Sequence, residues 1–598
     1  MMRVAAQSER PAPLLWPVYL VAVLLVSLIF SAITPPFQAP DEFDHVKRAY
    51  MLGQGQILLT SVDGSPSGGY LDSGLVAYME KFTPLKGIAA RKISSDELLA
   101  AGDVRWTGEA QFQTAVGTAY YFPLMYAPQA LGLGVGKALD LSVGKSYRLA
   151  RLLELITCGL LLMLAFRLHR PSAAMLVLLA LPMNLFLFGT AVLDPMATSV
   201  AMLSICAFMR LAVDRQAAPS WAMAALSIGV LLLCACRANM LPMLLLPFLA
   251  WWMMRERRQL YIAIAIAVFV LAWTLFTVKT TVYPTGGRQL DHAGRLLHFL
   301  SHPGELASIL LATWTDRGRM SFYAVSFVGV LGWLDTPFGP AFYKLTGAAL
   351  VAIVALSVNI EGWRTHAMPR LALVLVCVGS ILMTFLALLV QWTDPASPTV
   401  DGVQGRYLMI PLMCTVMALT ADNRPRNSIP FYLSHVLAAL MLCGMAYASA
   451  SLLVQRYYTA PMQVVLETLE LKPSPPLTGD QKVQLHFPPA QQNNPARLDR
   501  IGVRFGTYMT QHSGKAELRV WTQDGQTTVV PFDLMPLVDN GYAEFALEGK
   551  PYVGGEVVAR DGMGVSVWES HGEKTVLSCV LMHTQQQSAL LTQGCPEP

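Results

Sequence analysis

The sequence predicts a polytopic α-helical membrane protein with about 11 transmembrane helices, followed by a β-sandwich domain. Three observations predict this fold class. Hydrophobic residues make up 54% of the 598 residues, and charged residues only 14%. The apolar residues gather into about eleven runs, each close to the roughly 20 residues that a helix needs to cross a bilayer. After residue 455 the hydropathy falls, and short alternating segments replace the long runs.

The eleven apolar runs are expected to form the membrane-spanning helices. They cover residues 15–33, 149–167, 172–191, 195–213, 219–235, 239–254, 259–278, 340–359, 370–391, 407–421 and 429–452. The first run is long and lacks the small-residue cleavage pattern of a signal peptide. We therefore expect it to remain as a span.

Lys and Arg in the short loops predict the orientation, because such loops stay preferentially in the cytoplasm. With the N-terminus inside, every cationic short loop falls on the inner side: 167–170, 213–216, 255–258, 359–370 and 421–427. The apolar stretch 321–340 would move Arg364 and Arg370 outside if it were a further span. We therefore expect this stretch to be re-entrant or interfacial.

This orientation places three large pieces outside, namely loops at about 34–148 and 279–339 and the tail. Two domains are expected, a transmembrane domain at 1–455 and an extracytoplasmic, jelly-roll-like domain at 456–598. The tail contains seven or more short strand-like segments separated by turn signals such as Asp524-Gly525. Short strands at this spacing are typical of a β-sandwich.

Charge and cysteine content exclude some functions. The formal net charge of +4 indicates no nucleic-acid partner. Seven of the nine cysteines lie in or beside the apolar runs, where a free thiol behaves as a small apolar side chain. Cys579 and Cys595 lie in the exported tail, where a disulfide is chemically permitted. The cysteine spacing does not fit a zinc site.

The segment "PPFQAPDEFDHVKRAY", residues 35–50, follows the first run. Pro40 can occupy the first helical position, with Asp41 and Glu42 favourably placed in the first turn, so one interpretation is a capped interfacial helix. The spacing also places Asp41, then Asp44 or His45, and then Arg48 on one helix face. A carboxylate beside a histidine can take a proton from a hydroxyl, and an arginine can neutralise a departing phosphate.

Other polar residues are expected at the same outer membrane level. They are Asp194 in "FGTAVLDPM", Arg237 and Asn239 in "CRANMLP", and Gln404, Arg406 and Tyr407 in "VQGRYLMIPL". Asp194 could simply cap a helix, and Arg406 and Tyr407 could anchor the interface. Arg237 has almost no aqueous loop around it, which favours a paired or functional role. The middles of the runs are nearly free of charge, unlike those of a transporter.

Four segments together resemble a bacterial membrane-protein family of unknown function that is similar to the GT-C class of glycosyltransferases. They are "PPFQAPDEFDHVKRAY", "LPMNLFLFGTAVLDPM", "GVLGWLDTPFGP" and "VQGRYLMIPL", and the resemblance spans roughly 15–455. It implies a GT-C-like fold with an acidic motif in the first outer loop. It also implies a polyprenyl-phosphate sugar donor and an acceptor on the outer membrane face. Asp41 and Glu42 match the acidic motif in placement, and which of them is the base stays open.

The expected mechanism is an inverting displacement at the anomeric carbon. Asp41 or Glu42 is the general base, and His45 orients the carboxylate or the acceptor. The donor phosphate is expected to bind Arg237 and Arg406, with Arg48 as a further candidate. Substrate contacts are expected from Asp44, Asp194, Asn239, Gln404 and Tyr407. No cofactor is required, although these acids could hold a divalent cation such as Mg²⁺ or Mn²⁺.

The expected partners are a polyprenyl-phosphate-linked sugar, a lipid-linked or cell-envelope glycan acceptor, and the bilayer of the bacterial inner membrane. The site and the tail are expected to face the periplasm. Two alternatives from other classes stay open. One is a ligase or polymerase of lipid-linked glycans, and the other is a non-enzymatic scaffold for glycan export.

Overall fold

The computed structural model describes residues 15–596 with internal gaps. The gaps are residues 63–64, 90, 283–291, 421–427, 459–469, 479–480, 494, 561–562, 573–575, 585–588 and 593. Some expectations therefore concern residues outside the described ranges. They are those for the N-terminal flank before Leu15, for the inner loop 421–427 and for part of the outer loop 279–339.

The chain divides into two compact units, each described by itself. The helical unit comprises Met1–Tyr283, Met320–Thr384 and Gln404–Ala460, and the C-terminal unit comprises Pro284–Arg319, Phe385–Val403 and Pro461–Pro598. Two segments that precede residue 455 thus group with the tail. The division of the chain into domains at residue 455 stays a prediction.

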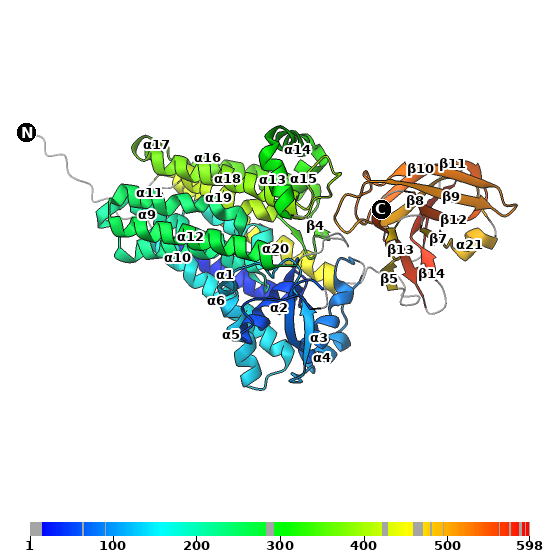
Figure 1. The fold of residues 1–598 in the computed structure, drawn as a ribbon, viewed down its shortest axis with the longest axis horizontal. Coiled ribbons are helices and arrows are strands. Elements are labelled where there is room, and N and C mark those ends of the chain that lie inside the picture. The colour runs from blue at the N-terminus through cyan, green and yellow to red at the C-terminus, as the bar shows by residue number, and fades with distance from the viewer. Residues whose placement is uncertain are drawn as a thin grey trace, which may run out of the picture. The chain divides into compact units, whose positions relative to one another are not determined.

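Each of the eleven apolar runs contains helix among its described residues. Among the described residues, seven helices are long and apolar enough to cross a membrane: α1 (Trp16–Ile33), α6 (Val143–Leu168), α9 (Leu193–Asp214), α12 (Arg257–Thr280), α16 (Pro340–Ser357), α18 (Ala367–Gln391) and α20 (Ile429–Tyr457). Shorter apolar helices are α10 (Ser220–Cys236), η4 (Ala238–Leu244) with α11 (Leu245–Met254), and η5 (Gly405–Leu408) with α19 (Met409–Thr420). Helices α9, α10 and α12 lie alongside one another (Figure 1). The chain is a mostly helical, multi-pass membrane protein.

The run 172–191 is broken rather than continuous. It forms α7 (Ala173–Ala180) and α8 (Pro182–Phe188), with Leu181 between them. Proline lacks a backbone N–H and disfavours helical geometry in the residue before it. The break therefore follows from Pro182.

The long segment between α1 and α6 has its own small fold. It contains α2 (Glu42–Gly53), α3 (Ser73–Glu80), η1 (Thr83–Leu85), α4 (Ser95–Gly102), η2 (Pro123–Tyr126), α5 (Ala127–Ala138) and the antiparallel pair β1 (Gly68–Asp72) and β2 (Ala110–Thr114). Helix α5 packs on α6, and α2 packs on α5. The start of α2 is thereby fixed against the helical unit.

The stretch 321–340 is not one long helix. It continues α15 (Arg317–Val328) and then forms a small hairpin of β3 (Val330–Leu331) and β4 (Thr336–Pro337). The 12 residues of α15 span about 18 Å at 1.5 Å per residue, short of the roughly 30 Å of a bilayer core. This length agrees with the expectation that the stretch is not a full span.

The remaining elements complete both units. In the helical unit they are η3 (Arg215–Ala217) and α17 (Ile360–Thr365), and in the C-terminal unit α13 (His292–Ser301), α14 (Pro303–Thr315) and α21 (Pro489–Asn493).

The tail forms β-sheets, as expected. One sheet has the order β10 (Thr527–Asp533), β9 (Lys515–Thr522), β12 (Tyr552–Ala559), β7 (Lys482–Leu485). The other contains β14 (Val576–Ser578), β13 (Met563–His571), β8 (Leu498–Gly506), β15 (Val580–Thr584) and β16 (Ala589–Leu591), with β11 (Tyr542–Lys550), β5 (Glu470–Pro473) and β6 (Leu477–Thr478) paired beside them. Both sheets contribute to one hydrophobic cluster, which is the arrangement of a β-sandwich. Cys579 and Cys595 form a disulfide.

Candidate functional site

The chain enters α2 through a residue in an unusual conformation. Asp41, which immediately precedes the helix, has φ 64° and ψ 5°, in the left-handed region. Few residues other than glycine adopt it, and aspartate is one that does. The Asp41 carbonyl oxygen accepts hydrogen bonds from the N–H groups of Asp44 and His45, at 3.0 and 3.1 Å. The Asp41 side chain makes no capping hydrogen bond, so its carboxylate is available to partners outside the helix.

That carboxylate meets Arg406. Arg406 Nη2 donates to Asp41 Oδ2 at 2.7 Å; the Asp41 side chain is 53% exposed and the Arg406 side chain 3%. Arg406 Nε donates to Gln404 Oε1 at 2.7 Å, and the guanidinium lies 5.2 Å from the ring centroid of Tyr407. The predicted residues Gln404 and Tyr407 therefore hold the arginine, which in turn holds an exposed acid.

The backbone beside Arg406 is tightly confined. Gly405 N–H donates to Ser326 Oγ on α15 at 2.8 Å. A side chain at Gly405 would place Cβ 2.1 Å from the backbone nitrogen of Phe327 and 2.3 Å from the carbonyl oxygen of Tyr323. Only glycine fits, which fixes the start of η5 against α15.

A second ion pair lies behind the first. Arg237, which follows α10, contacts Asp194 in the first turn of α9, with Nη2 3.0 Å from Oδ1. Asp194 Oδ2 also lies 3.7 Å from Arg406 Nη1. Asp41, Arg406, Asp194 and Arg237 thus form a continuous row of alternating charges, which we call the charged row. Its members come from four separate parts of the sequence.

Two arginine donors of the charged row make no hydrogen bond among the described residues, although Arg406 Nη1 keeps its 3.7 Å ion contact with Asp194. Arg406 Nη1 and Arg237 Nε are buried and make no hydrogen bond in this part of the chain. Buried polar groups are normally hydrogen-bonded, and arginine prefers the oxygens of carboxylates and phosphates. These two donors are therefore available to bind an anion.

His45 lies next to the charged row. It is 4% exposed, its Nδ1 is 2.8 Å from the hydroxyl oxygen of Tyr126, and its ring is parallel to that of Tyr121 at 6.3 Å. Burial lowers the pKa of His45 to about 4; the nearby carboxylates of Asp41 and Asp194 raise it, and the arginines of the row lower it. His45 is therefore neutral at pH 7 and acts as a hydrogen-bonding group.

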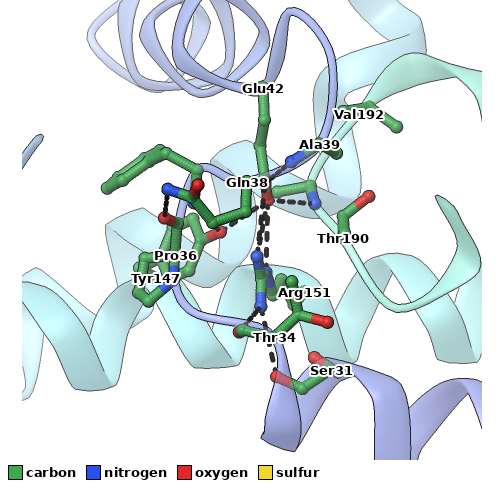
Figure 2. Close-up of polar contacts among 12 residues, drawn as sticks. Ser31, Thr34, Pro36, Gln38, Ala39, Glu42, Tyr147, Arg151, Thr190 and Val192 are labelled. Atoms are coloured by element: carbon green, nitrogen blue, oxygen red, sulfur yellow. Dashed lines mark hydrogen bonds and ion pairs between the residues drawn. The ribbon is translucent and has the colours of Figure 1, made fainter. Parts of the chain in front are cut away.

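Glu42 lies in a different environment from Asp41, and Figure 2 shows it together with Ala39, Tyr147 and Arg151. Its side chain is fully buried and pairs with Arg151, whose Nη2 lies 3.0 Å from Oε1. It also accepts hydrogen bonds from the Tyr147 hydroxyl and from the backbone N–H groups of Ala191, at 2.8 Å, and Ala39, at 3.2 Å. Its acceptor capacity is filled by protein donors.

Arg151 extends this contact to the end of α1. Its guanidinium donates to the carbonyl oxygens of Ser31 at 3.1 Å, Thr34 at 3.2 Å and Pro35 at 3.4 Å. The Glu42–Arg151 pair therefore joins the end of α1, the start of α2, α6 and the segment between α8 and α9. It fixes the backbone immediately next to Asp41.

The side chains of three predicted site residues make no hydrogen bond or ion pair with the charged row among the described interactions. Arg48 is buried and donates to the carbonyl oxygens of Gln56 and Ile57, at 3.1 and 2.7 Å. Asp44 pairs with Lys47 at 3.0 Å. Asn239 donates to Thr384 Oγ1 at 2.9 Å.

The expected common helix face of Asp41, His45 and Arg48 does not form. The helix begins at Glu42, so Asp41 lies outside it in a left-handed conformation and Pro40 is not its first residue. Helical spacing does not apply across such a residue.

Sequence reasoning missed Arg151, Tyr126 and Tyr147. Arg151 had a signal, because it is a cation inside the apolar run 149–167, and such a residue usually has a specific partner. Nothing local distinguished the two tyrosines from other aromatic residues. Within the described ranges, no group of three or more His, Cys, Asp or Glu side chains could hold a metal ion, and dependence on a divalent cation stays a prediction.

Comparison with known proteins identifies one family model that matches this chain. The family model described as "Predicted membrane protein (DUF2142)" matches residues 24–416. No curated protein matches the chain. The similar solved structures are of ArnT from Cupriavidus metallidurans: in the apo state (15% identity, 74% of this chain and 77% of that one, TM-score 0.31) and bound to undecaprenyl phosphate (14%, 72% and 78%, 0.28). At these TM-scores the likeness supports no statement about the site.

Proposed function

This chain belongs to the DUF2142 family of predicted membrane proteins, and we propose that it is a GT-C-type glycosyltransferase of the bacterial inner membrane. It transfers a sugar from a polyprenyl-phosphate donor to a lipid-linked or cell-envelope glycan acceptor at the periplasmic face. The observation that carries the proposal is the contact between the half-exposed carboxylate of Asp41 and the buried guanidinium of Arg406. Asp41 can act as a base and Arg406 can bind an anion, so the two functions lie in direct contact. Arg237 supplies a further donor in the same charged row.

The reaction is an inverting displacement. Asp41 takes the proton of the acceptor hydroxyl, and the acceptor oxygen forms a bond to the anomeric carbon of the sugar. The bond between that carbon and the phosphate oxygen breaks, and its electron pair leaves with the polyprenyl phosphate. The transferred proton stays on Asp41 until the products dissociate.

The charged row gives each group a role. The donor phosphate binds Nη1 of Arg406 and Nε of Arg237, neither of which makes a hydrogen bond among the described residues, and their fixed positive charge stabilises the developing phosphate charge. A phosphate on Arg406 competes with Asp41 for that guanidinium, so donor binding leaves the Asp41 carboxylate freer to accept a proton. Asp194 keeps both arginines in place.

Glu42 and His45 support the site in this proposal. The Glu42 carboxylate already accepts from Arg151, Tyr147 and two backbone N–H groups, which favours Asp41 as the base and Glu42 as a positioning residue. His45 has its Nδ1 occupied by Tyr126, so its substrate contact is through Nε2. A monophosphate donor held by two arginines needs no metal, although a divalent cation remains compatible with the chemistry.

A complementation experiment tests the proposal. A deletion strain carrying the wild-type gene, Asp41→Asn or the control Asp96→Asn, an exposed carboxylate on α4, is compared by mass spectrometry of its envelope glycans. We expect one sugar to be missing with Asp41→Asn and present with the other two. Shortened glycan chains would indicate a polymerase or ligase instead, and unchanged glycans in the deletion strain would leave the scaffold alternative.

A further inference from the structure

Lys86 lies over the ring of Trp333. Its Nζ is 3.9 Å from the Trp333 ring centroid and 6.0 Å from that of Phe43. Lys86 directly follows η1 in the first outer loop, and Trp333 lies in the turn between β3 and β4. The turn belongs to "GVLGWLDTPFGP", a segment that contributes no residue to the charged row.

The Trp333 ring is held in place. Its Nε1 donates to the carbonyl oxygen of Phe37 at 2.9 Å, and its ring centroid is 6.1 Å from that of Phe43. The next residue, Leu334, has φ 60°, a strained value for a branched side chain. Because Phe37 and Phe43 flank Asp41 in the sequence and stack on each other at 4.9 Å, Trp333 and Lys86 lie beside the segment that carries Asp41.

The ammonium group of Lys86 is available to bind an anion. Among the described residues it makes no salt bridge within 4.0 Å, whereas its neighbour Lys47 is bonded to Asp44 at 3.0 Å and to the Thr114 carbonyl oxygen at 3.1 Å. Partial desolvation of the ammonium lowers the pKa of Lys86 although the residue as a whole is exposed, and the negative charges of Asp44 and Asp41 raise it. The ammonium is therefore close to the catalytic carboxylate but has no ion-pair partner.

The cations near Asp41 differ in exposure. Arg406 and Arg237 are largely buried, with side chains 3% and 11% exposed, whereas Lys86 is an exposed residue. A donor phosphate held by the two buried arginines would leave the exposed Lys86 free to bind another anion. The acceptor hydroxyl must approach Asp41 from the side that the donor does not occupy.

We propose that Lys86 binds an anionic group, a phosphate or carboxylate, of the sugar acceptor and that Trp333 holds its ammonium ready for this contact. The inference rests on the proposed transferase function and names the acceptor class as an acidic glycan or glycolipid. A cation–π contact at a partly exposed site is weak. A charge-assisted hydrogen bond to an anion is stronger, so the ammonium can leave the ring when the acceptor arrives.

The test uses the full chain in nanodiscs of neutral lipid and measures binding of two probes. The acceptor probe is glucose 6-phosphate, with glucose as the uncharged comparison, and the donor probe is undecaprenyl phosphate. The variants are Lys86→Gln, Lys86→Arg, Arg406→Gln and the control Lys81→Gln, an exposed lysine in the same loop. Trp333→Leu tests the aromatic contact.

We expect wild type and Lys81→Gln to bind glucose 6-phosphate more tightly than glucose. Lys86→Gln should lose roughly tenfold in affinity for glucose 6-phosphate, as for one charge-assisted hydrogen bond, and Lys86→Arg should keep most of it. Undecaprenyl phosphate should bind Lys86→Gln as it binds wild type, and Arg406→Gln more weakly. Trp333→Leu should weaken glucose 6-phosphate binding alone.

The outcomes separate the two proposals. If undecaprenyl phosphate binds but Lys86→Gln leaves glucose 6-phosphate affinity unchanged, the assignment of Lys86 is wrong and the transferase proposal stands. If Lys86→Gln weakens undecaprenyl phosphate instead, Lys86 belongs to the donor site and the acceptor assignment is wrong. If wild type binds no undecaprenyl phosphate, the proposed function itself fails.

Discussion

Arg406 donates a 2.7 Å hydrogen bond to the carboxylate of Asp41, a residue 365 positions earlier in the chain. Because Asp41 is half exposed, an ion pair of this kind contributes little to the free energy of folding. Its importance is positional, since it places a solvent-facing acid against a buried guanidinium. The predictions below follow from this contact and from the side chains around it.

Asp41→Asn should strongly slow sugar transfer and leave the protein folded. The first N–H groups of the helix bond to the backbone carbonyl of residue 41 and not to its side chain. Asparagine also tolerates the left-handed conformation. Removing a general base lowers the rate by about 10²–10⁴-fold. Turnover of a polyprenyl-phosphate sugar by purified protein measures the rate, and a melting temperature equal to that of Asp96→Asn checks folding. Full activity in Asp41→Asn would contradict the assignment of the base.

Glu42→Gln should destabilise the protein instead. It removes the charged partner of the buried Arg151, and breaking such a pair costs about 3–5 kcal/mol. Thermal unfolding in detergent, compared with the exposed control Glu80→Gln, measures the loss. The double variant Glu42→Gln/Arg151→Met should recover part of it, because no unpaired charge is left. A Glu42→Gln protein as stable as wild type but inactive would point to Glu42 as the base.

Arg406→Lys should weaken binding of undecaprenyl phosphate by roughly tenfold or more, because lysine keeps the charge but not the planar, multi-donor geometry. The exposed Arg148 on α6 offers a matched Arg→Lys control that should bind as wild type does. Equilibrium binding to protein in nanodiscs gives both affinities. Equal affinities for the two variants would place the phosphate elsewhere.

His45 should make the protein less stable as the pH falls from about 6.5 to about 4. The unfolded chain binds a proton on this ring below its ordinary pKa of 6.5, whereas the folded chain does so only below about 4. The unfolded state therefore holds more protons in this window, and stability rises with pH across it. The full effect is roughly 2–4 kcal/mol.

Melting temperatures between pH 4 and pH 7 test this prediction. His45→Gln, which can still bond Tyr126, should flatten the pH dependence, and the exposed control His302→Gln should not. The same slope in wild type and His45→Gln would show that His45 does not titrate in this window.

The membrane helices could be predicted because each apolar run carries its own signal. Pro182, which splits the run 172–191, was also visible in the sequence. Asp41, Asp194, Arg237 and Arg406 could be predicted to lie near one another because all four flank the ends of apolar runs, and the contacts of the charged row bring them together; their common membrane level stays a prediction.

The difference between Asp41 and Glu42 could not be predicted. The two acids are adjacent and chemically alike, and only the packing of α6 and of the segment before α9 encloses Glu42. The link between Lys86 and Trp333 was equally hidden, because it joins two distant loops. Helical spacing misled at Arg48 because a left-handed residue at position 41 shifts the start of α2.

The confinement of Gly405 makes the position of Arg406 depend on a helix that carries no charged-row residue. Because the backbones of Gly405 and α15 meet without a side chain between them, a displacement of α15 would carry Arg406 away from Asp41. A substitution at Gly405 would force the two backbones apart and would separate the acid from the guanidinium without changing either side chain.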